Sequence, residues 1–168
     1  MDPQPDWRQA FDSLLVRLSA AGRDVYGNRL VSLVVFGSVG RGTMRPDSDV
    51  DLLVVARDLP KGRIRRVQEF ETVESRIREA LSLAREHGVT TRISPVFKTP
   101  EEVQAGSPLF LDMVEDARML VDEREFMLGA LASLRDRLHR LGARRLWRGD
   151  AWLWDLKPDY QPGEIFEL

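Results

Sequence analysis

Two aspartates, Asp49 and Asp51, begin a segment that is otherwise apolar, Asp49-Val50-Asp51-Leu52-Leu53-Val54-Val55. In a β-strand, alternation places both carboxylates on one face, with Cα atoms ~6.5–7 Å apart. Like charges at that spacing on a half-buried sheet raise one pKa, and a divalent cation removes the repulsion. Oxygen-only ligands favour Mg²⁺ or Mn²⁺. The pair therefore predicts a metal site in which Asp49 and Asp51 are both metal ligands and catalytic residues.

A glycine-containing loop precedes the aspartates. Gly37 allows close approach of the backbone to a phosphate, and Ser38 offers a hydroxyl and an amide N–H. Arg41 and Arg45 lie in the same loop and can pair with phosphate oxygens. We therefore predict that Gly37, Ser38, Arg41 and Ser48 bind a nucleotide. A phosphate cradle facing a metal site is what phosphoryl or nucleotidyl transfer requires.

Other phosphate-binding motifs do not fit this loop. The sequence has no Gly-Lys-Ser/Thr, and the spacing of Gly37, Gly40 and Gly42 does not match a dinucleotide-binding fold. The plainer alternative is a hairpin-like loop whose acids are only solvated, since Asp favours turns. We favour the chemical interpretation because the two aspartates stand inside the strand pattern.

The surrounding pattern predicts the elements that position these residues. Hydrophobic periodicity and capping signals indicate helices over about residues 6–23, 63–87, 107–116 and 125–141. Short β-branched runs indicate strands over about residues 30–36, 49–55, 90–98 and 118–122, and Pro95 makes the third an edge or bulged strand. We therefore predict an α+β fold: a small mixed β-sheet with helices packed on it, plus a C-terminal helix and a Trp-rich extension.

Composition narrows the class of protein. The 168 residues are 43% hydrophobic and 31% charged, which excludes a disordered chain. The length suits a single domain over residues 1–168, with a core at about 25–122 and the C-terminal helix and extension at about 123–168. Cysteine is absent, which excludes thiolate metal sites and Cys nucleophiles and fits a reducing compartment.

Charge and apolar runs indicate the surroundings and the partners of the protein. No apolar run approaches the ~20 residues of a membrane helix, and the acidic N-terminus does not resemble a signal peptide. We expect a soluble, cytoplasmic protein with no membrane association. The net charge of −2 and the acids that follow the arginine-rich segment 135–148 argue against nucleic acid as a partner. His87 and His139 are isolated and are interpreted as structural or solvated.

The pattern Gly37-Ser38, followed after a ten-residue loop by Asp49-Val50-Asp51, resembles the signature of the DNA polymerase β-like nucleotidyltransferase superfamily, closest to its minimal nucleotidyltransferases. The resemblance covers about residues 25–98 and implies the polymerase β-like fold. It implies that Gly37 and Ser38 contact the terminal phosphates while Asp49 and Asp51 hold the metal ions. It also implies transfer of NMP from an NTP to a hydroxyl acceptor, with release of pyrophosphate.

The third predicted strand departs from that family. Active members usually carry a third carboxylate there, whereas residues 89–98 contain no Asp or Glu and offer Arg92 or Ser94 in its place. Glu101 and Glu102 are weak substitutes, better interpreted as helix capping. A hydroxyl cannot act as a general base near neutral pH. Two functions therefore stay open: a transferase with an unidentified acceptor, or a catalytically weakened, antitoxin-like nucleotide-binding subunit of a helical partner protein.

Overall fold

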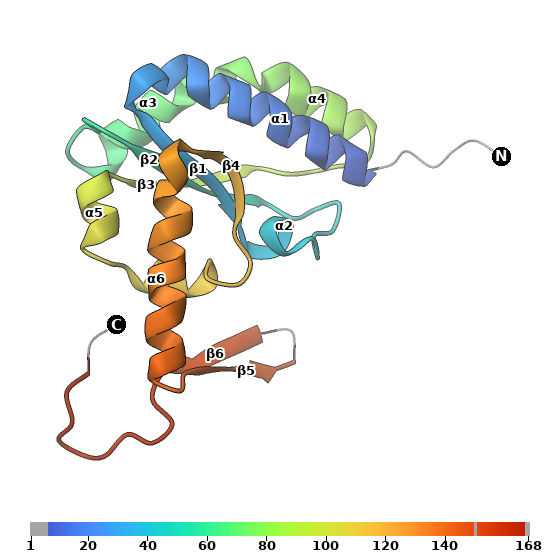
Figure 1. Ribbon diagram of the computed structural model, residues 1–168. Helices are drawn as coiled ribbons and strands as arrows, with labels where there is room; N and C mark the ends of the chain where they lie inside the picture. Colours follow the sequence, from blue (N-terminus) through green and yellow to red (C-terminus); the bar gives the residue numbers. More distant parts are fainter. Residues whose placement is uncertain (1–6, 150, 167–168) are drawn as a thin grey trace.

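The computed structural model describes residues 7–149 and 151–166 and contains a mixed four-stranded sheet in the order β3-β2-β1-β4 (Figure 1). These strands are Leu30–Phe36 (β1), Val50–Ala56 (β2), Ile93–Lys98 (β3) and Arg118–Asp122 (β4). Strand β1 is antiparallel to β2 and β4, and β2 is parallel to β3. The predicted α+β architecture with a mixed sheet is confirmed.

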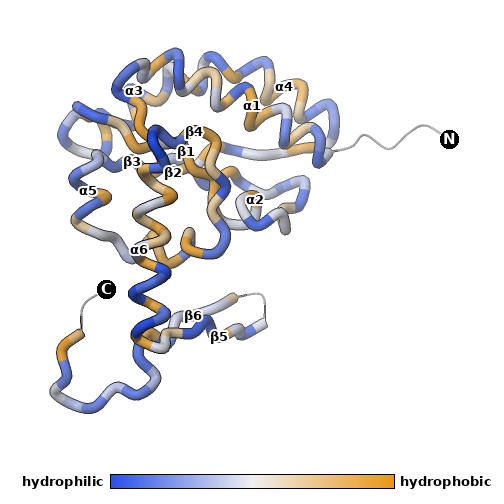
Figure 2. Tube along the Cα trace, viewed as in Figure 1, coloured by the Kyte–Doolittle hydropathy of each residue, from blue (hydrophilic) through white to orange (hydrophobic). Residues whose placement is uncertain are grey.

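One face of the sheet is covered by helices α1 (Trp7–Tyr26), α3 (Arg63–Arg76) and α4 (Arg78–Glu86). Their apolar side chains, among them Phe11, Leu14, Phe70 and Val73, form one hydrophobic core with alternate residues of the strands. Figure 2 shows hydrophilic and hydrophobic residues alternating along α1 and α4. This alternation is the amphipathic pattern that buries one side of each helix.

The other face is covered by α5 (Pro100–Gln104), a 3-10 helix (Pro108–Asp112) and α6 (Phe126–Arg140). Their buried residues form a second core with Val34, Leu53 and Val55 of the strands. Asp51 lies on this face, because side chains alternate along β2 and Leu53 and Val55 belong to the second core. Helix α6 contacts β1 and β4, and α5 contacts β2 and β3.

A separate hairpin follows α6, formed by the antiparallel strands β5 (Arg144–Arg148) and β6 (Ala151–Asp155). Trp154 and Leu156 pack against the second core and attach the hairpin to the body of the molecule. Strand β6 lies in the predicted Trp-rich extension, and Trp152 and Trp154 alternate along it. Strand β5 was not predicted, because arginines dominate its sequence.

Three predicted elements are corrected. The single helix over residues 63–87 is two helices that meet at Ile77, which is fully buried with φ −100° and ψ 6°. This bend lets α4 pack on α1 while α3 keeps its contact with β3. The helix over residues 107–116 is the short 3-10 helix, and residues Gly37–Arg41 form a five-residue helix, α2, where a loop was expected.

The remaining boundaries differ by a few residues. Asp6, the first residue of the predicted N-terminal helix, lies outside the described residues. Among the described helices, none has the length and apolar character needed to cross a membrane.

Candidate active site

Gly37 and Asp51 are in contact at the junction of β1 and α2. Phe36, the last residue of β1, pairs with Asp51 of β2, so the chain enters α2 directly beside that carboxylate. Gly37 has φ +66°, and a Cβ at this position would overlap Asp51 Oδ2. Only glycine meets both demands, the left-handed backbone and the absence of a side chain.

The Asp51 carboxyl is destabilised as an anion in the free protein. Burial raises its pKa above the usual value, and the negative charge of Asp49 raises it further, whereas the Arg41 guanidinium acts in the opposite direction. Asp49 lies just before β2, where its Oδ1 accepts a hydrogen bond from the Arg92 backbone N–H (3.3 Å) and its Oδ2 pairs with Arg92 Nη2 (3.2 Å). Arg92 is largely exposed, so this pairing is easily exchanged for solvent.

These two carboxylates fit a divalent cation. A half-buried Asp51 beside a second acid gains from a positive charge placed between them. The described residues contain no group of three or more acids or histidines that could hold a metal ion. Mg²⁺ commonly uses one or two carboxylates and takes its remaining ligands from water and substrate phosphates. The donor set is therefore sufficient for a metal that arrives with a nucleotide.

Ser94 occupies the position beside Asp51 on the next strand. The parallel register pairs Asp51 with Ser94, so the two side chains lie on the same face of the sheet. Arg92, the other residue considered for the third-acid position, instead pairs with Asp49. The strand therefore presents a hydroxyl beside Asp51.

The loop between α2 and β2 is shaped by its own hydrogen bonds. The Thr43 N–H donates to the Ser38 carbonyl (2.9 Å), and Gly42 ends α2 with φ +73°. The Arg45 N–H donates to Ser48 Oγ (2.9 Å), and the Ser48 N–H donates to the Arg45 carbonyl (3.0 Å). Ser48 thus closes the turn that leads into Asp49, while Ser38 is half-buried on α2.

Arg41 connects α2 to a cluster that sequence reasoning missed. Its Nη1 lies 3.5 Å from Asp116 Oδ2, and its guanidinium lies 4.5 Å from the ring centre of Trp152 on β6. Arg145 of β5 pairs with the same Asp116 oxygen at 3.0 Å and lies on Trp152 as well, at 4.7 Å. No local pattern could reveal this cluster, because its members come from distant parts of the chain.

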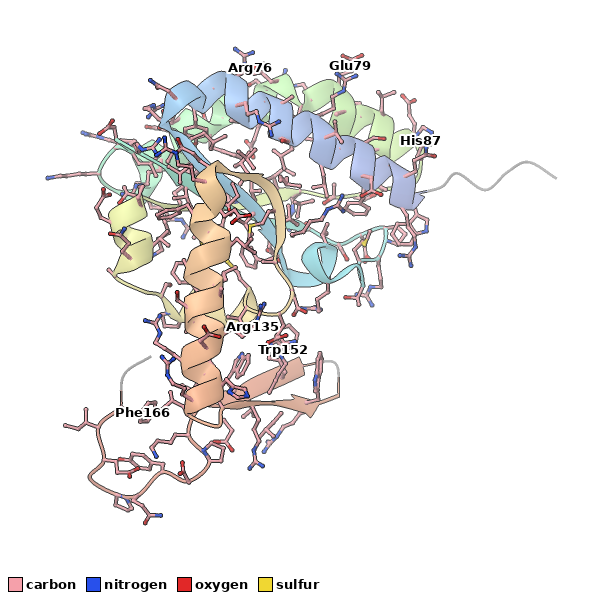
Figure 3. All side chains as sticks on the ribbon, viewed as in Figure 1. Arg76, Glu79, His87, Arg135, Trp152 and Phe166 are labelled. Carbon is pink, nitrogen blue, oxygen red and sulfur yellow. The ribbon has the colours of Figure 1, made fainter. Side chains whose placement is uncertain are left out.

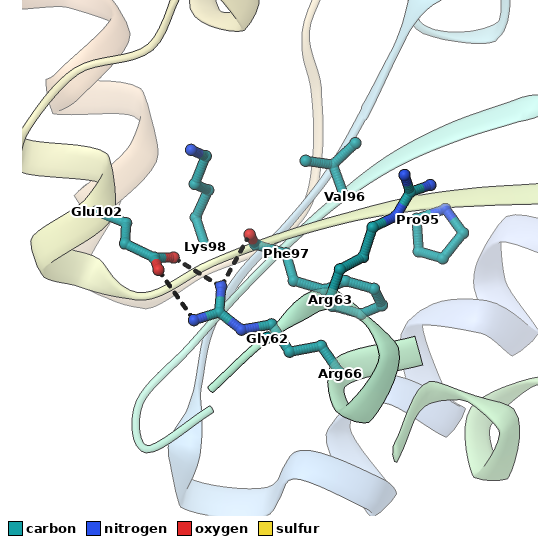
Figure 4. Close-up of a pocket in the computed structure, with 8 residues that line it drawn as sticks. All are labelled: Gly62, Arg63, Arg66, Pro95, Val96, Phe97, Lys98 and Glu102. Atoms are coloured by element: carbon teal, nitrogen blue, oxygen red, sulfur yellow. Dashed lines mark hydrogen bonds and ion pairs between the residues drawn. The ribbon is translucent and has the colours of Figure 1, made fainter. Parts of the chain in front are cut away.

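The remaining candidates lie away from Asp51. Glu102 forms a bidentate ion pair with Arg66 (2.8 and 2.9 Å) and completes the capping box of α5, beyond the far end of β3 (Figure 4). This pair lines a cavity of about 510 Å³ beside Pro95, Phe97 and Lys98. Figure 3 shows His87 at the end of α4, where its Nδ1 is 2.9 Å from the Leu83 carbonyl oxygen. Because it is bound to Arg66 beyond the far end of β3, Glu102 cannot supply the missing acid.

Comparison with known proteins shows the family to which the chain belongs. Residues 23–116 match the sequence model of the nucleotidyltransferase domain. A putative protein adenylyltransferase of Methanocaldococcus jannaschii is 30% identical over 118 residues, which cover 69% of this chain and 75% of that protein. The chain belongs to the nucleotidyltransferase domain family and is an enzyme of that class, and the resemblance seen in its sequence is confirmed.

Comparison with solved structures found chains of toxin–antitoxin complexes. A chain of a toxin–antitoxin complex with AMP-PNP has a TM-score of 0.45 and 21% identity, covering 80% of this chain and 90% of that one. A chain of a variant of the toxin–antitoxin pair MntA-HpeT has a TM-score of 0.44 and 19% identity, covering 80% of this chain and 89% of that one.

Proposed function

We propose that this enzyme is a metal-dependent nucleotidyltransferase that moves AMP from ATP to a hydroxyl group of a protein. The observation that carries the proposal is the half-buried Asp51 carboxylate, placed against Gly37 at the start of α2 and beside Asp49. The adenylyl group and the protein acceptor are inferred from the M. jannaschii relative, whose name describes a protein adenylyltransferase.

In this proposal, each residue of the site has a distinct task. Gly37 lets the backbone approach the terminal phosphates, and Ser38 offers its hydroxyl and N–H to them. Asp49 and Asp51 hold Mg²⁺ or Mn²⁺, which when bound neutralises charge on the phosphates. The acceptor oxygen attacks the α-phosphorus, the bond to the β-phosphate oxygen breaks, and pyrophosphate leaves.

Neither residue that was considered for the third acid can accept the proton of the acceptor hydroxyl. Ser94 cannot take that proton near neutral pH, and Arg92 occupies Asp49 in the free protein. We therefore expect slow turnover with firm nucleotide binding. Release of Asp49 from the exposed Arg92 accompanies metal binding in this proposal.

Calorimetric titration with Mg·ATP tests the proposed site. Wild type should bind, and binding should be lost in the double variant Asp49→Asn with Asp51→Asn and in wild type titrated with ATP and EDTA. Asp47→Asn, an exposed acid of the same loop, should leave binding unchanged and serves as the control. Equal binding by wild type and the double variant would contradict the assignment.

The Ser94 and Arg92 arrangement also favours a second candidate function. A site that binds nucleotide without a base for the acceptor suits a weakened, antitoxin-like subunit that acts through a helical partner protein. Transfer of α-labelled AMP to an added protein separates the two candidates. Transfer by the isolated chain, even at a slow rate, supports the enzyme, whereas firm Mg·ATP binding without transfer supports the second candidate.

A further inference from the structure

The C-terminal hairpin contacts the nucleotide-binding segment although it lies outside the family match. That match ends at residue 116, whereas β5 and β6 span Arg144–Asp155. Figure 3 shows Trp152 on the side of the hairpin that faces the rest of the molecule. There its ring meets Arg41, the last residue of α2. The hairpin therefore touches the same short helix that begins with Gly37 and Ser38.

Trp152 is in contact with two guanidinium groups. Arg41 and Arg145 lie 4.5 and 4.7 Å from its ring centre, a spacing at which a cation is attracted to an indole face. The two arginines also share Asp116, whose side chain is only 12% exposed. The guanidinium of Arg41 is thus held by a ring and a carboxylate that both come from outside its own helix.

The guanidinium of Arg41 acts on two carboxylates. Arg145 is hydrogen-bonded to Asp116, whereas Arg41 Nη1 is buried 3.5 Å from the same oxygen without a hydrogen bond. The positive charge of Arg41 also lowers the pKa of Asp51, against the larger effects of burial and of Asp49. Arg41 is therefore held by Asp116 and Trp152 while its charge reaches the carboxylate of the candidate site.

Backbone packing also holds α2 against the segment that contains Asp116. A Cβ on Gly40 would lie 2.5 Å from the Asp116 carbonyl oxygen, so α2 and the Asp116 segment are in direct backbone contact. The hairpin has its own attachment, because Trp154 Nε1 donates to the Leu111 carbonyl (3.2 Å). Since Trp154 anchors the hairpin independently, the contact of Trp152 with Arg41 is not needed for anchoring.

We propose that Trp152 is a positioning residue of the nucleotide site, and that it holds the Arg41 guanidinium in the orientation that binds the β- and γ-phosphates. The C-terminal hairpin is then part of the active site rather than an appendage. This inference rests on the proposed function. It predicts that loss of the indole ring weakens the binding of ATP most, that of ADP less and that of AMP least.

The experiment compares Trp152→Leu, Trp152→Phe and Trp147→Leu by calorimetry with Mg·ATP, Mg·ADP and AMP. Trp147 is the matched control, because it contacts Trp152 and Arg145 while its ring is 56% exposed. Trp152→Leu should weaken Mg·ATP binding about tenfold and AMP binding less than about twofold. Trp152→Phe should recover most of the affinity, since it keeps an aromatic face, and Trp147→Leu should resemble wild type.

Each alternative result has a definite meaning. Equal Mg·ATP affinities in wild type and Trp152→Leu, or equal losses for ATP and AMP, would overturn the inference and leave the proposed function intact. A wild type that binds no nucleotide would overturn both.

Fluorescence provides a second measurement should Trp152→Leu fail to fold. In the double variant Trp7→Phe with Trp147→Phe, only Trp152 and the anchoring Trp154 emit, and Trp152 is the one that lies on Arg41. The emission of this double variant should change on addition of Mg·ATP and not on addition of AMP. No change with Mg·ATP, in a variant that still binds it, would contradict the inference.

Discussion

Gly37 combines two separate requirements for glycine, which makes it the sharpest single-residue test of the site. Gly37→Ala places a methyl group onto Asp51 Oδ2 and holds alanine at φ +66°. We expect a stability loss of about 1–2 kcal/mol from the left-handed backbone and loss of Mg·ATP binding from the displaced carboxylate. Urea unfolding and calorimetry measure the two effects.

Gly27→Ala is the matched control for that variant. Gly27 has φ +54°, and a Cβ there meets nothing within 4 Å. The stability loss should be similar, and Mg·ATP binding should be retained. If both variants keep full binding, the contact between Gly37 and Asp51 has no role in the site.

The raised pKa of Asp51 gives a second prediction at this scale. Because burial and Asp49 disfavour the charged form in the folded protein, the favourable contribution of protonated Asp51 is complete below its unfolded pKa. It is lost as pH rises through the raised folded pKa. Asp51→Asn should therefore stabilise the metal-free protein at neutral pH, and this gain should disappear in acid.

Thermal melting at several pH values, with and without Mg²⁺, measures this effect. Mg²⁺ with ATP should stabilise wild type and leave Asp51→Asn unchanged, because a ligand stabilises only the state that binds it. Asp47→Asn should be stabilised by Mg²⁺ with ATP as wild type is, and should show no gain in stability without metal at neutral pH, as its side chain is exposed. A destabilised Asp51→Asn at neutral pH would contradict the electrostatic account.

Ser94→Asp supplies the missing carboxylate in register with Asp51. A general base typically contributes 10²–10⁴-fold to a rate, so pyrophosphate release should rise visibly even with imperfect geometry. Nucleotide affinity should change little, and Ser94→Asn, which has the same shape without the charge, should give no increase. No gain in Ser94→Asp, together with fast wild-type turnover, would mean that another group accepts the proton.

At the scale of elements, Arg66 joins α3, β3 and α5. It forms the ion pair with Glu102, donates from Nε to the Pro60 carbonyl (2.8 Å) and donates from Nη1 to the Phe97 carbonyl (3.3 Å). Its side chain is only 14% exposed, and the hydrogen bonds between the two side chains raise the pKa of Arg66 and lower the pKa of Glu102. The carboxylate and both carbonyl groups lose their partner when Arg66 is removed.

We therefore expect Arg66→Ala to lower the free energy of unfolding by about 1–3 kcal/mol. Arg65→Ala, an exposed neighbour on the same helix, should stay within about 0.5 kcal/mol of wild type. Urea denaturation of the two variants makes the comparison. Equal losses would show that helix propensity rather than the contacts of Arg66 accounts for the change.

Features that depend on contacts between residues close in the sequence could be predicted, whereas features that depend on contacts between distant residues could not. Strands β1 and β4 have the predicted bounds, because their apolar runs are short and bounded by turn residues. The capping box at Thr99 was also predicted, since all of its partners are local. The bend at Ile77 and strand β5 were not, because tertiary packing decides the first and arginines obscure the second.

The candidate site divides in the same way. The nearness of Gly37 to Asp51 could be predicted, because one short segment joins their strands. The sequence offered Arg92 or Ser94 on the third strand, and the register with Asp51 selects Ser94. The expected strand position of Asp49 is corrected, since β2 begins at Val50. The contacts of Arg41 with Asp116 and Trp152 depend on how α6 directs the hairpin, and local sequence carries no signal for that.

At the scale of the whole molecule, the two hydrophobic cores share one sheet. Leu52 and Val54 face the first core, and Leu53 and Val55 face the second. Since Trp154 joins the hairpin to the second core, we propose that residues 7–166 unfold in one cooperative transition. Urea transitions followed by tryptophan fluorescence and by far-UV circular dichroism should coincide. Separate midpoints would show that the hairpin unfolds independently.

Strand β3 forms an edge of the sheet, and its composition affects behaviour at high concentration. Pro95 has no N–H to offer to an approaching strand, and the Phe97 carbonyl is already bonded to Arg66. An open edge with free donors and acceptors is a template on which a second molecule can add its own strand. Proline and a capped carbonyl remove that template at consecutive outward positions. The residues of β3 that line the cavity beside α3 thus disfavour the addition of a strand from a second copy of this protein to this edge.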